Sequence, residues 1–179
     1  MRQVVLALLV LAGLVHSAGA EPPDRVFAGA ILVSAKPFAP PGKTDAETIA
    51  AIKKQAATVF AEDKKEHTWT LYFVGYFKQP VDDVEYVLKV KDLSNKTQVL
   101  ISADKYLSAR GLRTASAKLM LDKDKVGVNK ELLVTMESRG KLLATGRIQI
   151  TGEGEHFTGK VDFSDDEEDD NAKQPDKKH

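Results

Sequence analysis

The stretch that decides the fold is HTWTLYFVGYF, residues 67–77. Its side chains alternate between two faces with a period of two residues, which is the period of a β-strand and not of a helix. Both faces are largely apolar, so the pattern predicts a central strand that carries aromatic side chains on both sides. One face holds Trp69, Leu71, Phe73 and Phe77, and the other holds Thr70, Tyr72, Val74 and Tyr76.

The same alternation recurs in shorter segments along the rest of the chain, separated by turn residues. Consecutive segments are joined by short links, which favour antiparallel hairpins because parallel strands need a crossover of about a dozen residues. The sequence therefore predicts a mainly β fold, an antiparallel β-sandwich of about eight strands. The other seven strands are expected within residues 26–33, 85–92, 98–104, 116–122, 131–138, 141–151 and 156–163.

In general architecture this strand pattern resembles immunoglobulin-like sandwiches, although the Cys…Trp…Cys signature of true immunoglobulin domains is absent. The resemblance concerns architecture only, and architecture does not give function. In such a sandwich the alternation places Val99 and Leu142 among the side chains that face the core.

One amphipathic helix is expected after the first strand, at about residues 44–63. Thr44 and Glu47 form a capping box, in which each side chain satisfies a backbone amide at the helix start. A helix with an apolar stripe has to bury it, so we expect it to cover an open end or one face of a sheet. The stripe consists of Ile49, Ile52, Ala56, Val59 and Phe60.

The first twenty residues, 1–20, read as a secretory signal peptide. Arg2 precedes an apolar run at residues 4–15, and residues 18–20 are Ala-Gly-Ala, an A-x-A cleavage signal. The competing interpretation is a membrane anchor, but spanning a bilayer takes about 20 apolar residues. We therefore expect an exported protein without a membrane span. The chain has no cysteine, which favours a bacterial periplasmic or secreted protein and excludes thiol chemistry.

The remaining chain is expected to be a single domain, residues 21–164, followed by a disordered acidic tail, residues 165–179. The domain has 22 Lys and Arg against 19 Asp and Glu, which is too balanced to suggest nucleic acid as a partner. The tail opens with six consecutive carboxylates, which repel one another and bury no apolar area. Two interpretations remain open for the tail, a solvated end and a docking element.

No motif predicts catalysis, a cofactor or a metal. Residues 122–131 resemble a calcium-binding loop, but Val126 offers no side-chain oxygen at the fifth position and Glu131 falls at the tenth instead of the twelfth. His67 and His156 are expected to be solvated residues at strand ends, because two histidines without matching acidic spacing are not a zinc signature. No G-x-S-x-G nucleophile elbow is present.

Two groups of residues are candidates for binding a ligand or partner. The first is aromatic, and its alternative interpretation is core packing on one sheet face with the helix covering the other. The second is a basic loop around Gly111, whose alternative interpretation is a solvated surface. The candidates are Trp69, Tyr72 and Tyr76 in the first group and Lys105, Arg110 and Arg113 in the second.

These observations favour a non-enzymatic, exported binding protein that contacts another envelope protein or a surface polymer. Exposed edge strands would allow it to accept an extended segment of a partner by β-augmentation. The alternative function is a small carrier that holds an apolar ligand between sheet and helix, in a cavity lined by Trp69, Phe73 and Ile52. A hydrolase without a recognisable motif is a weaker alternative.

Overall fold

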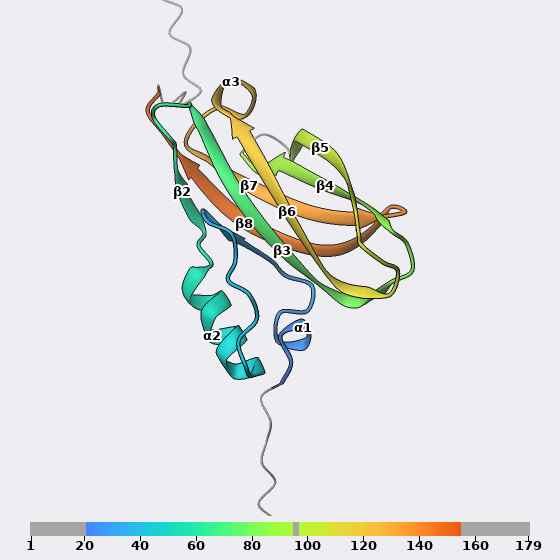
Figure 1. Ribbon diagram of the computed structural model, residues 1–179. Helices are drawn as coiled ribbons and strands as arrows, with labels where there is room; N and C mark the ends of the chain where they lie inside the picture. The colour runs from blue at the N-terminus through green and yellow to red at the C-terminus, as the bar shows by residue number, and fades with distance from the viewer. Residues whose placement is uncertain (1–20, 95–96, 155–179) are drawn as a thin grey trace, which may run out of the picture.

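The computed structural model of the protein describes residues 21–94 and 97–154 (Figure 1). Over these residues the chain is mainly β, with eight strands and three helices. The expected signal peptide, the strand expected at residues 156–163 and the acidic tail lie outside the described residues. No helix among the described residues is long and apolar enough to cross a membrane.

The smaller sheet has three antiparallel strands in the order β1-β3-β6. β3 pairs with β1 on one side and with β6 on the other. The prediction that residues 67–77 form a central strand with two apolar faces is therefore confirmed. The strands are β1 (Ile31–Ser34), β3 (Thr68–Val81) and β6 (Leu112–Asp122).

The larger sheet has five strands in the order β2-β8-β7-β4-β5. Its pairs are antiparallel except at one edge, where β2 runs parallel to β8. The expectation of a wholly antiparallel fold is wrong at that edge. The strands are β2 (Val59–Ala61), β4 (Glu85–Asp92), β5 (Gln98–Tyr106), β7 (Lys130–Ser138) and β8 (Lys141–Thr151).

The main apolar core takes side chains from both sheets, and Figure 1 shows β3 and β6 crossing the strands of the larger sheet. The two sheets also meet at an edge, where the start of β1 lies beside β8. There Ala30 forms an isolated bridge with Thr145, and the Thr145 amide donates a hydrogen bond to the Gly29 carbonyl at 3.0 Å. The largest fully buried side chains include Trp69, Leu71, Phe73, Phe77, Tyr86, Leu88, Leu121, Leu132 and Met136.

The helix that follows β1 is α2 (Asp45–Gln55), and it begins as the capping signal predicts. The Thr44 hydroxyl accepts a hydrogen bond from the Glu47 amide at 3.2 Å. The Glu47 carboxylate reaches one residue further back than in a standard capping box and accepts from the Lys43 amide at 2.9 Å. Two short helices also occur, α1 (Pro23–Val26) and α3 (Lys123–Val126).

The predicted end of this helix, at residue 63, is wrong. Ala56 is extended, and Val59 and Phe60 belong to β2 beside β8. Phe60 is 4% exposed in the main core between the sheets, whereas Val59 is 55% exposed. The helical spacing of these two residues is outweighed by the ladder with β8 and by the burial of one aromatic ring.

A second apolar cluster covers the outer face of the three-stranded sheet. Ile52 of α2 packs there with Val74 and Tyr76 of β3, as expected for a helix that covers a sheet face. The ring of Phe27 lies 5.2 Å from the ring of Tyr76. Both faces of β3 are therefore apolar because each faces a different cluster.

Two side chains expected in the core are on the surface. Val99 is 49% exposed and Leu142 is 57% exposed. The ladder shifts register beside each of them, between Val90 and Lys91 for the first and between Met136 and Glu137 for the second. A bulge adds one residue to a strand and so interrupts the two-residue alternation. The neighbours Leu100 and Leu143 pack against the core.

Candidate functional site

The three aromatic residues predicted to bind a ligand or partner do not share one surface. Trp69 is 1% exposed in the main core, where its indole N–H donates to the Thr151 carbonyl at 3.1 Å. Tyr76 is buried in the other cluster, and burial raises the pKa of its phenol. Only Tyr72 reaches the surface, with the ammonium of Lys118 lying 5.7 Å from its ring centroid. These aromatics therefore serve mainly as packing groups on opposite faces of β3.

The three basic candidates are spread over two strands and the connection between them. Lys105 lies on β5 opposite Tyr86, and Arg110 is exposed in the connection. Arg113 lies on β6, where its guanidinium donates to the Lys78 carbonyl at 3.3 Å and forms an ion pair with Asp24 at 3.7 Å. Arg113 is thus already engaged within the fold.

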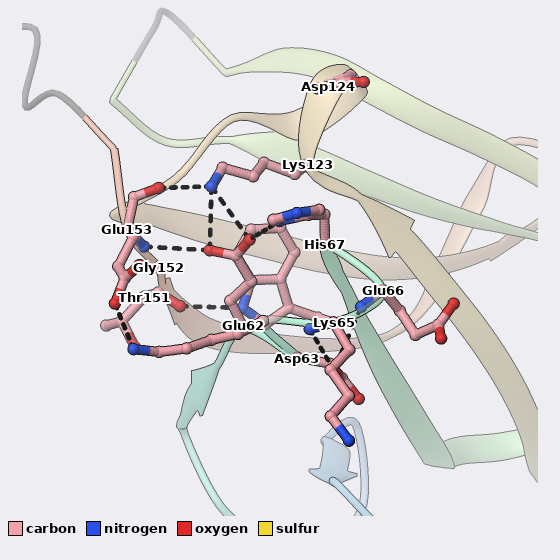
Figure 2. Close-up of polar contacts among 12 residues, drawn as sticks. Glu62, Asp63, Lys65, Glu66, His67, Lys123, Asp124, Thr151, Gly152 and Glu153 are labelled. Carbon is pink, nitrogen blue, oxygen red and sulfur yellow. Dashed lines mark hydrogen bonds and ion pairs between the residues drawn. The ribbon is translucent and has the colours of Figure 1, made fainter.

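One polar cluster that the sequence did not reveal lies at the end of the molecule where β3 begins (Figure 2). The side chain of Glu62 is 3% exposed and accepts hydrogen bonds from three partners. These are the Lys123 ammonium at 3.1 Å, the His67 Nδ1–H at 2.9 Å and the Glu153 amide at 3.1 Å. We name Glu62, His67, Lys123 and Glu153 the Glu62 junction.

The electrostatics of the Glu62 junction suit a structural connection. The hydrogen bond from His67 is the largest influence that holds the pKa of Glu62 below its usual value, and Lys123 acts in the same direction. Lys64, which pairs with Glu153, lowers the pKa of that second carboxyl. The charged carboxylates thus connect the segment after β2, the start of β3, α3 and the end of β8.

Two arrangements are relevant to the Glu62 junction among the described residues, a nucleophile beside a base and a group of metal ligands. Within residues 21–94 and 97–154, no Ser or Thr hydroxyl is hydrogen-bonded to His67, so no nucleophile–base pair is formed. In the same part of the chain, no group of three or more acidic or histidine side chains is arranged around a metal position. The carboxylate of Glu62 is already hydrogen-bonded to His67, Lys123 and the Glu153 amide.

One feature open to a partner is the outer edge of β5, an edge strand of the larger sheet. The Leu107 amide donates to the Val84 carbonyl at 2.7 Å, which fixes the phase of the β4–β5 ladder. Because hydrogen-bonded and non-hydrogen-bonded pairs alternate in an antiparallel ladder, every second residue of β5 directs its backbone groups away from β4. From the register, these residues are Ser102, Asp104 and Tyr106.

The side chains of the same three residues are also exposed, and that of Tyr106 is 70% exposed. In the described part of the chain, β4 is the one strand that pairs with β5. A second hydrogen bond agrees with this assignment, because the Leu93 amide donates to the Glu131 carbonyl of β7. The residues of β4 that do not bond to β5 therefore direct their backbone groups toward β7. We name Ser102, Asp104 and Tyr106 the β5 edge.

Comparison with known proteins adds no assignment to these sites. No protein-family model matches the sequence. No curated protein matches it significantly. The function is therefore inferred from the residues of this chain and their geometry.

Proposed function

We propose that the protein is a non-enzymatic binding module that accepts an extended segment of a partner protein onto the β5 edge. The observation that carries this proposal is the set of three outward-directed backbone amides and three carbonyls at alternate positions. Such a row of unpaired groups is a template for another strand.

A polypeptide backbone matches this row better than a surface polymer does. Successive residues of a strand rise by about 3.3 Å, so equivalent groups on the β5 edge recur about every 6.6 Å, which is the repeat of a second strand. Main-chain hydrogen bonds would supply affinity, and the side chains at alternate positions would supply specificity.

The core-facing side of the larger sheet indicates the sequence of the partner segment. Leu100, Ile101 and Ala103 of β5 are only half-buried, although the first two pack against the main core. A strand added beside β5 would cover them with its own inward-facing side chains. We therefore expect a segment that alternates apolar and polar residues, with the apolar ones over Ile101 and Ala103.

The same proposal includes the type of sandwich and the cellular location. The two sheets with a shared core support an immunoglobulin-like sandwich, and residues 1–20 support export to the periplasm or beyond, where an envelope protein would be the partner. The mass of the mature protein purified from the envelope tests the export. A carrier with its ligand between helix and sheet has less support, because Ile52 and Trp69 belong to separate clusters.

The experiment is a selection of extended peptides from a phage-displayed library on the full chain, followed by binding measurements on two variants. Asp104→Pro removes an outward amide and leaves the ladder to β4 complete, since that amide makes no bond to β4. Asp104→Ala is the matched control, because it removes the same side chain and keeps the amide. We expect the selected peptides to bind the wild type and Asp104→Ala, and to lose at least tenfold in affinity for Asp104→Pro.

Hydrogen exchange of the wild-type complex locates the contact independently of folding in the variants. Bound peptide should slow amide exchange at Ser102, Asp104 and Tyr106. The proposal is wrong if no peptide is selected, or if the selected peptides bind Asp104→Pro as tightly as Asp104→Ala.

A further inference from the structure

A cleft of about 480 Å³ opens at the other end of β3 from the Glu62 junction. It is lined by the last residues of β3, the turn into β4 and the hairpin between β7 and β8. Its volume lies in the range of small-molecule sites, about 300–1,000 Å³. The apolar part of its lining includes Phe77, Val81, Leu142, Leu143 and Ala144.

The apolar lining continues from the core to the surface. Phe77, Val81 and Ala144 are buried members of the main cluster, so the cleft opens onto the end of the space between the two sheets. Leu142 is 57% exposed at the same place, because the bulge in the β7–β8 hairpin turns it away from the core. An alkyl chain in this cleft would cover apolar surface that water now contacts, at about 25 cal/mol per Å² of apolar area.

The rim of the cleft carries an excess of positive charge. Asp83 and Arg139 neutralise each other through an ion pair of 2.6 Å between the two turns. Lys78 and Lys141 have no ion-pair partner within the described residues, and of the acidic lining residues only Asp82 is likewise unpaired there. The stem of Lys78 lies against Gly29, where a Cβ would stand 2.7 Å from the lysine Cε, so this side chain is held along the wall.

We propose that this cleft binds an amphiphile with a long alkyl chain and a carboxylate head. The chain lies on Phe77, Val81 and Ala144, and the head meets the ammonium groups of Lys78 and Lys141. A neutral apolar ligand would leave both cations unused, and a purely ionic ligand would leave the apolar lining exposed. This site is separate from the β5 edge, so it can be present whether or not a strand adds there.

The test uses dansylamino-undecanoic acid as the fluorescent probe and its methyl ester as the uncharged match. Titrations of the full chain compare the wild type with a double variant, Lys78→Gln with Lys141→Gln. The charge-matched control is Lys54→Gln with Lys125→Gln, two exposed lysines outside the cleft. All four substitutions are on the surface, and circular dichroism checks that the fold is kept.

We expect the acid to bind the wild type more tightly than the ester does. An exposed ion pair contributes a factor of up to about five, so the cleft variant should bind the acid about tenfold more weakly. The ester should bind both proteins equally, and the control variant should resemble the wild type.

Leu142→Asp supplies a second test, because it places a carboxylate in the apolar mouth at a position that is already exposed. It should abolish binding of the acid. The proposal is overturned if neither probe binds, if acid and ester bind equally, if the cleft variant keeps wild-type affinity for the acid, or if Leu142→Asp still binds it.

Discussion

Substitution of Gly146 tests the contact between β1 of the smaller sheet and β8 of the larger sheet. It lies on β8 next to Thr145, which forms an isolated bridge with Ala30 just before β1. An ideal Cβ on Gly146 would overlap the carbonyl oxygen of Ile31 and stand only 3.1 Å from the Ile31 Cβ. Both atoms belong to the body of β1, so a methyl group there has to push the strand away from β8.

The magnitude of the Gly146→Ala effect follows from two opposing contributions. Overpacking in a well-packed region costs about 1–3 kcal/mol. Replacing glycine where no positive φ is required stabilises by about 0.4–1 kcal/mol through the unfolded chain. We expect the free energy of unfolding to fall by about 1–2 kcal/mol, a decrease in Tm of about 2–8 °C for a domain of this size.

The assay is urea unfolding followed by the fluorescence of Trp69, the single tryptophan, which is buried in the core. Gly111→Ala is the matched control, since a Cβ there meets no atom within 4 Å and the loss comes from its φ of 79° alone. That strain costs about 1 kcal/mol. If Gly146→Ala is as stable as the wild type or more stable, β1 does not approach β8 as described.

The remaining predictions concern β2 and one buried ion pair. In urea unfolding, Phe60→Ala should lower the free energy of unfolding by about 3–5 kcal/mol and Val59→Ala by less than about 0.5 kcal/mol, because only the first substitution removes core volume. Similar losses for the two variants would contradict the assignment of these residues to β2. The carboxylate of Asp92 is buried and accepts from the Lys130 ammonium at 2.6 Å. Burial raises the pKa of Asp92, but the hydrogen bonds from Lys130 and the Ser94 amide outweigh it and leave that pKa below its usual value. A lowered pKa contributes stability above the unfolded value, near 4, that is lost as the pH falls through the folded value. Lys130→Met should therefore cost about 1.5–3 kcal/mol in urea unfolding at pH 7, and this loss should shrink as the pH falls through the folded pKa of Asp92; a loss that is the same at pH 7 and in acid would contradict this.

The sequence predicted most strands because their burial follows the two-residue period. Tyr86, Leu88 and Val90 are buried as the alternation requires, and β3 is central as its two apolar faces require. Val99 and Leu142 were misplaced because a bulge leaves no mark in the composition of a strand.

β2 and the Glu62 junction could not be predicted from the sequence, for a different reason. Phe60 keeps the helical spacing from Ile52, and only the tertiary ladder with β8 shows that the helix has ended. With residue 62 assigned to that helix, nothing in the sequence marks Glu62 as a buried acid. Its partners Lys123 and Glu153 lie 61 and 91 residues away, and no local pattern pairs them.

The sequence raises strand addition as a hypothesis, but it does not locate the strand edge that the proposal uses. The sequence suggested strand addition at an exposed edge, yet the identity of the edge depends on the order of strands in the sheet, which is set by non-local pairing. The aromatic candidates Trp69 and Tyr76 were buried by the two sheet faces that the same pattern had predicted.

Amide hydrogen exchange of the free protein, resolved residue by residue by NMR, tests the central claim most directly. The amides of Ile101, Ala103 and Lys105 bond to β4 and should be protected, whereas those of Ser102, Asp104 and Tyr106 should exchange rapidly with solvent. This alternation within one strand is the signature of an open edge. Uniform protection along β5 would show that the edge is already covered and would contradict the account.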